Sequence, residues 1–129
     1  MGLHPPFRPL AKAKRRRAEH LGRQAEDEVA ALFQGRGYEV LARRLKTGAG
    51  EIDLVVANAR CLVFVEVKAR TNFADASYAV VPRQQARLLR AANVALASHA
   101  AWARPETRFD IALITPGGID IIENALWLS

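Results

Sequence analysis

The sequence has little cysteine, no long apolar run and no clustered histidine. Cys61 is the one cysteine among 129 residues, which excludes a disulfide framework and a zinc site built on cysteine. No apolar stretch approaches the ~18 residues that a membrane-spanning helix needs. Pro5, Pro6 and Arg8 interrupt any signal-peptide core near the start of the sequence. We therefore expect a protein of the reducing cytosol, with a cytoplasmic location.

Acidic residues are missing from the first 17 positions, and all the excess positive charge gathers there. The chain has 19 Lys+Arg and 13 Asp+Glu, a formal net charge of +6. Residues 18–129 hold 19 − 6 = 13 bases and 13 acids, because six bases lie in the first segment: Arg8, Lys12, Lys14, Arg15, Arg16 and Arg17. We predict a flexible basic arm over 1–17 and a single domain over 18–129. Such an arm favours a polyanion such as nucleic acid; a solvated tail is the plainer alternative.

Hydrophobic periodicity predicts the order helix, three strands, helix, two strands. In the first helix the apolar residues recur at helical spacing: Leu21, Ala25, Val29, Leu32 and Phe33. The expected helices cover 19–34 and 82–98, and the expected strands cover 38–45, 51–56, 61–69, 108–114 and 119–126. Short turns between the first three strands indicate a meander. The class is then α/β or α+β, with a mixed sheet of about five strands flanked by helices.

Charged residues interrupt the end of the most apolar strand, 61–69. Alternation places Val63, Val65 and Val67 on one face of the sheet, and it places four residues on the other face: Leu62, Phe64, Glu66 and Lys68. Such a strand belongs in the middle of a sheet, where charges are costly unless they are paired or used. In strand 51–56, Glu51 and Asp53 share one face, and Ile52, Leu54 and Val56 share the other.

The loop over 57–60 decides whether these acids meet. A loop of two or four residues places Glu51 opposite Glu66 and Asp53 opposite Phe64, whereas a three-residue loop breaks this parity. Residues directly opposite one another have Cβ atoms ~4.5–5.5 Å apart. With an even loop, Lys68 and all three carboxylates converge on one patch.

Three close carboxylates repel one another unless a cation neutralises them. Oxygen ligands without histidine or cysteine suit Mg²⁺ or Mn²⁺. Such an ion polarises a phosphodiester oxygen and activates a bound water. Lys68 beside it can orient that water or steady the charge growing on the phosphate. A cross-strand Lys–Glu salt bridge at the rim of the sheet is the alternative, and the two interpretations carry equal weight at this point.

Two motifs in these strands closely resemble the YraN family of small predicted bacterial endonucleases. The motifs are Gly50-Glu51-Ile52-Asp53-Leu54-Val55 and Val63-Phe64-Val65-Glu66-Val67-Lys68-Ala69-Arg70. The family is similar to the Holliday-junction-resolvase branch of the restriction-endonuclease-like, PD-(D/E)XK fold. The resemblance covers residues 21–125 and includes further matches at Leu21-Gly22-Arg23, Gly37-Tyr38, Leu41-Ala42-Arg43, Arg108-Phe109-Asp110 and Asn124-Ala125.

The resemblance implies an α/β, restriction-endonuclease-like domain that hydrolyses phosphodiester bonds in DNA, branched or flapped DNA included. Asp53, Glu66 and Lys68 match the nuclease signature, and Glu26 matches an accessory acid. Asp53 and Glu66 would then hold Mg²⁺ or Mn²⁺, with Glu51 or Glu26 assisting through water. DNA is the expected partner in preference to RNA, and resolvase-like relatives also allow a homodimer. A non-catalytic nucleic-acid-binding or partner-docking module on the same fold is the competing hypothesis.

Several positions depart from the family pattern or flank the expected site. Ala25 replaces the usual Gly, Arg44-Leu45 replaces Asn-Trp, and Gln84 replaces the Lys that usually opens the second helix. Gln84 lies beside the apolar face of that helix, within reach of the sheet edge, and joins the candidate site. The helix also carries Arg83, Arg87 and Arg90 on its polar side, which favours a solvated face over a DNA-binding stripe. Four further bases flank the site and are candidate DNA contacts: Arg43, Arg44, Lys46 and Arg70.

Overall fold

The computed structural model of the chain describes residues 22–69 and 82–125. The predicted basic arm, with Lys12, Lys14, Arg15, Arg16 and Arg17, and also Arg70, lies outside these residues. A helix over 22–35 is followed by β1 (Glu39–Thr47), β2 (Gly50–Ala57), β3 (Cys61–Ala69), α3 (Pro82–Ser98), the 3₁₀ turn η1 (Ala100–Trp102), β4 (Glu106–Thr115) and β5 (Gly118–Ile122). In this part of the chain no helix has both the length and the apolarity to cross a membrane.

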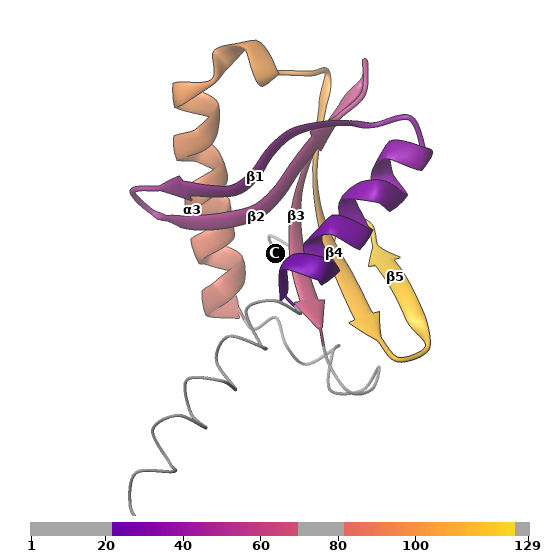
Figure 1. The fold of residues 1–129 in the computed structure, drawn as a ribbon. Coiled ribbons are helices and arrows are strands. Elements are labelled where there is room, and N and C mark those ends of the chain that lie inside the picture. The colour runs from indigo at the N-terminus through magenta and orange to yellow at the C-terminus, as the bar shows by residue number, and fades with distance from the viewer. Residues whose placement is uncertain (1–21, 70–81, 126–129) are drawn as a thin grey trace, which may run out of the picture.

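The five strands form one mixed sheet in the order β1-β2-β3-β4-β5. Neighbouring strands are antiparallel except β3 and β4, which are parallel and are connected through α3. The helix over 22–35 and α3 lie on opposite sides of the sheet (Figure 1). The predicted α/β class, with a meander and a five-stranded mixed sheet flanked by helices, is confirmed. This arrangement is consistent with a restriction-endonuclease-like fold.

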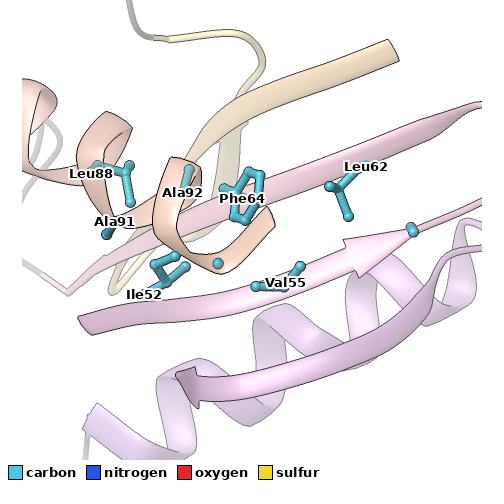
Figure 2. Packing of buried hydrophobic residues seen from close by; sticks show 9 residues of the cluster. Ile52, Val55, Leu62, Phe64, Leu88, Ala91 and Ala92 are labelled. Carbon is cyan, nitrogen blue, oxygen red and sulfur yellow. The ribbon is translucent and has the colours of Figure 1, made fainter. Parts of the chain in front are cut away.

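Two apolar layers enclose β3, as its alternating sequence predicts. On one face α3 packs against β2 and β3 (Figure 2), where the cluster includes Ile52, Val55, Leu62, Phe64, Leu88, Ala91 and Ala92. On the other face the helix over 22–35 contributes Val29, Ala30 and Phe33 to a cluster with Leu54, Val56, Val63 and Val65. The alanines of α3 have short side chains, so this helix lies close to the sheet. Any charged group on β3 is therefore held between two apolar layers.

The predicted pairing of β2 with β3 is wrong by two residues. Ala57 pairs with Leu62 and Val55 with Phe64, so Asp53 is not opposite Phe64 and Glu51 is not opposite Glu66. The reason is the turn: the Asn58 side-chain oxygen accepts the amides of Arg60 (2.9 Å) and Cys61 (2.8 Å). The Asn58 amide in turn donates to the Cys61 carbonyl at 3.0 Å, so the turn closes between Asn58 and the first residue of β3.

Strict alternation along β2 is also wrong at one residue. Ile52 joins Val55 in the cluster under α3, whereas Leu54 and Val56 face the other helix. The alternation of side chains between the two faces of the sheet is therefore broken at Asp53. Across the ladder, β1 residues Arg43 and Leu45 pair with Leu54 and Ile52. The residue between them, Arg44, has a positive φ of 50°. The irregularity in both strands thus lies beside the candidate site.

The last strand is shorter than the predicted 119–126, because the segment after it forms a hydrogen bond with the buried carboxylate of Asp110. β5 ends at Ile122, and the amide of Asn124 (φ 50°) donates to Asp110 Oδ1 at 3.0 Å. Asp110 has no exposed surface and accepts two hydrogen bonds from Arg108, at 2.8 and 2.9 Å. One buried carboxylate therefore holds both β4 and the segment that follows β5.

We expect Asp110→Ala to lower the free energy of unfolding by about 3 kcal/mol or more, because it leaves the half-buried Arg108 without its buried partner and with only the exposed Glu123 at 3.9 Å. Urea denaturation measures this loss. Asp120→Ala on the exposed side of β5 is the matched control, with an expected change within about 0.5 kcal/mol. Equal effects of the two substitutions would contradict a structural role for Asp110.

Candidate functional site

Asp53 is fixed against β3 by a hydrogen bond from the main chain. The amide of Val67 donates to Asp53 Oδ2 at 2.8 Å. The regular β2–β3 ladder ends with the pair Leu54 and Val65, so the hydrogen bond from Val67 to Asp53 lies just beyond that end. It brings the Asp53 carboxylate to the segment that carries Glu66 and Lys68. The sequence predicted this proximity correctly, although through a different register.

Glu66 is the second carboxylate of the site and is nearly enclosed. Its side chain is 9% exposed, and Oε1 lies 3.1 Å from Lys68 Nζ and 3.9 Å from Arg87 Nη2. The other oxygen, Oε2, is buried and has no hydrogen-bond partner among the described residues. A buried oxygen without a partner is unfavourable by about 1–3 kcal/mol or more. Glu66 therefore presents a free acceptor beside Asp53.

The environment of Asp53 disfavours its charged form. Burial is the main cause that raises the pKa of Asp53, and repulsion from Glu66 adds to it. The Val67 amide and Lys68 act in the opposite direction, and Glu26 adds a weaker repulsion. The resulting pKa of Asp53 is about 7, against an ordinary value of 3.8. Near pH 7 the Asp53 carboxyl is therefore about half protonated.

Glu26 reaches the site from the helix over 22–35, where its side chain is 15% exposed. Its Oε1 accepts a hydrogen bond from Arg44 Nε at 2.6 Å. The neighbouring Arg43 pairs with Asp27 on the same helix, at 2.5 Å. Adjacent residues of a strand normally point to opposite faces. The positive φ of Arg44 breaks that alternation and allows both arginines to contact one helix.

The remaining predicted residues are more dispersed. Glu51 is exposed. Its main-chain carbonyl, rather than its carboxylate, accepts a hydrogen bond from Arg87. Among residues 22–69 and 82–125, no group of three or more histidines, cysteines or acids is placed to hold one metal ion. The expected meeting of Glu51 with Glu66 fails because the register is shifted. Lys46 is exposed on β1, and Gln84 lies in the first turn of α3 with its side chain outside the described part.

Arg87 is a site residue that the sequence analysis missed, since it was assigned to a solvated face. It lies beside Glu66 and donates from Nη1 to the carbonyl of Glu51 at 3.2 Å. Gly50 makes room for it: a Cβ at this position (φ 139°) would lie 2.8 Å from Arg87 Nη1. The neighbouring Leu88 is buried, so Arg87 borders the apolar face of α3. Gly50 at the start of β2 was the one feature of the sequence that could have indicated this role of Arg87.

Comparison with known proteins places the chain in a family. The model of the uncharacterised protein family UPF0102 matches residues 25–114. The chain belongs to the UPF0102 family. A UPF0102 protein of Acidiphilium cryptum is 51% identical over 113 residues, 88% of each chain. One of Rhodopseudomonas palustris is 50% identical over 95 residues (74% of this chain, 73% of the relative), and one of Bradyrhizobium diazoefficiens is 46% identical over 107 (83% and 80%).

For this UPF0102 protein, the raised pKa of Asp53 predicts a stability that depends on pH. Between about pH 4 and pH 7 the folded state binds more protons than the unfolded state, so stability falls as pH rises. The penalty vanishes below about pH 4 and is complete above about pH 7. In EDTA, Asp53→Asn should therefore stabilise the protein at pH 8, by about 4 kcal/mol at most, and little at pH 4.

Urea denaturation of wild type and variant at both pH values measures this effect. Asp120→Asn, on the exposed side of β5, is the control and should change stability little at either pH. If Asp53→Asn lowered stability at pH 8, the ionised carboxylate would be a structural salt-bridge partner, and the repulsion described above would be refuted.

Proposed function

We propose that this UPF0102 protein is a metal-dependent endonuclease of the PD-(D/E)XK type that hydrolyses phosphodiester bonds in DNA, branched or flapped DNA included. The observation that carries the proposal is the pair Asp53 and Glu66. One buried oxygen of Glu66 has no hydrogen-bond partner within 22–69 and 82–125, and Lys68 lies 3.1 Å from the other oxygen. The resemblance of both strand motifs to the YraN endonucleases supports it.

The donor set of the pair fits Mg²⁺ or Mn²⁺. Asp53 and Glu66 offer only oxygen ligands, and these ions commonly bind one or two carboxylates and keep several waters. A cation would satisfy Glu66 Oε2 and relieve the repulsion that raises the pKa of Asp53. Asp53 and Glu66 would hold the ion. When bound, it polarises a phosphodiester oxygen and lowers the pKa of a water.

The protein's own groups supply positioning. The Val67 amide keeps the Asp53 carboxylate in place, and Arg87 supports Glu66 from α3. Lys68 carries donors on a side chain that is only 16% exposed. It orients the attacking water and stabilises the charge that develops on the phosphate. Glu26, Glu51 and Gln84 are the auxiliary members, which assist through water or contact the substrate.

Binding of the DNA backbone is assigned to basic residues around this site. On the described strand β1, Lys46 is exposed, whereas Arg43 and Arg44 are paired with acids. The arm residues and Arg70 add positive charge in the sequence. Contacts of this kind neutralise phosphates and release counterions, which makes DNA affinity fall as the salt concentration rises.

We expect calorimetry to detect Mn²⁺ binding to the full chain and Asp53→Asn to abolish it. Because the pKa of Asp53 is about 7, binding at pH 7 should also release part of a proton, and at pH 9 it should release almost none. Titrations in buffers of different ionisation enthalpy measure the released proton. Asp120→Asn should bind like wild type. Mn²⁺ binding that survives Asp53→Asn would place the ion elsewhere.

Lys68→Ala should remove DNA cleavage without abolishing Mn²⁺ binding, because an ammonium group is not a metal ligand and its removal takes a positive charge away from Glu66. Linear, flapped and four-way DNA with Mg²⁺ or Mn²⁺ form the substrate panel. Arg90→Ala, on the exposed side of α3, is the control and should keep activity. Gln84→Lys tests the first turn of α3, where a gain in rate is expected.

If the wild-type protein binds Mn²⁺ but cleaves none of these DNAs, the proposed nuclease activity is rejected. DNA binding without turnover would then support the competing hypothesis of a non-catalytic nucleic-acid-binding module.

A further inference from the structure

Arg44 occupies an unusual place in the middle of β1. Its φ of 50° lies in the left-handed region, which is unfavourable for a residue with a Cβ by about 1–2 kcal/mol. Such conformations persist where surrounding contacts stabilise them, and they cluster at functional sites. The Arg44 side chain forms a hydrogen bond and ion pair with Glu26, at 2.6 Å.

The guanidinium of Arg44 lies among the acids of the candidate site. Glu26 accepts its Nε–H, and the charges of Glu26, Glu51 and Asp53 all favour its protonated form. These are three of the four acids that the sequence assigns to the site. Glu66 is the fourth, and it is paired with Lys68 and Arg87.

A second ion pair joins β1 to the helix over 22–35 next to this one. Arg43 links β1 to the same helix through Asp27, and that acid is 70% exposed to water. Glu26, in contrast, is 15% exposed and acts electrostatically on Asp53. Two adjacent arginines of similar exposure (44% for Arg43 and 38% for Arg44) therefore bind two adjacent acids beside one pocket, and Glu26 is the more buried of these acids.

We propose that Arg44 is a tethered counter-cation of this site, whose ion pair with Glu26 and a bound divalent cation weaken each other. The proposal rests on the proposed function, since it needs a cation at Asp53 and Glu66. A positive charge among the acids stabilises them in the metal-free protein and repels an incoming ion. By linkage, the bound ion must weaken the Arg44–Glu26 pair by the same factor. Arg44 is thus a positioning residue for Glu26 that also sets metal affinity.

The test compares Mn²⁺ affinities of the full-length wild type, Arg44→Gln and Arg43→Gln at one ionic strength. Arg44→Gln should bind Mn²⁺ about fivefold more tightly or better, an effect on the order expected for removing one nearby, partly screened charge. Arg43→Gln should stay within about twofold of wild type. Equal affinities for the two variants, or weaker binding by Arg44→Gln, would overturn the proposal.

The outcomes separate this proposal from the function beneath it. Wild-type binding that Arg44→Gln does not strengthen rejects the counter-cation alone. No Mn²⁺ binding by any variant rejects the metal site and the counter-cation together. Urea denaturation first verifies that the variants fold. If Arg44→Gln does not, Arg44→Asn replaces it, because asparagine tolerates the left-handed region better than most residues.

A second measurement reads the ion pair directly and does not depend on activity. The Nε–H of Arg44 is its donor to Glu26, so its NMR signal reports on that hydrogen bond. Titration with diamagnetic Mg²⁺ should shift this signal at the concentrations that saturate the site. The Arg43 signal should remain unchanged and serves as the internal control. An unchanged Arg44 signal in the Mg²⁺-saturated protein would contradict the mutual weakening.

Discussion

The hydrogen bond from the Val67 amide to Asp53 Oδ2 is the interaction on which the candidate site depends. It joins a carboxylate of β2 to the main chain of β3 at the point where the ladder between the two strands ends. Without it, Asp53 would be a charged residue at the irregular end of a strand. With it, Asp53 lies beside Glu66 and the repulsion between them becomes a property of the fold. Because both apolar layers pack on β3, that repulsion acts in a poorly solvated environment.

The parts of the fold that depend on periodicity could be predicted from the sequence. Alternation in Cys61–Ala69 correctly placed the valines under one helix and Phe64 under the other. Pro82 marked the start of α3, and the meander followed from short turns. Such signals are local, and each residue contributes to them independently. Asp53, Glu66 and Lys68 were predicted to lie together, and Asp53 still reaches this end of β3 through the Val67 amide, although the alternation of β2 breaks beside it.

Features that depend on a single hydrogen bond or on the backbone of one residue could not be predicted from periodicity. The Asn58 side chain shifts the register of β2 against β3, and no periodic signal reports it. The left-handed backbone of Arg44 redirects two arginines toward one helix. Arg87 reaches Glu66 because Gly50, 37 positions earlier in the sequence, has no side chain. The departures at Arg44 and Arg87 lie beside the candidate site, where local rules yield to electrostatics.

The charges of the site form a balance that explains why the metal-free protein tolerates them. Lys68 and Arg87 flank Glu66, Arg44 holds Glu26, and Asp53 is left with a main-chain donor and a raised pKa. Asp53 is thus an acid whose charge the Val67 amide and Lys68 compensate only in part. A divalent cation that binds there gains more than it would at an acid already paired. The same imbalance lowers stability at neutral pH, so the fold maintains it through the burial of β3 between its two helices.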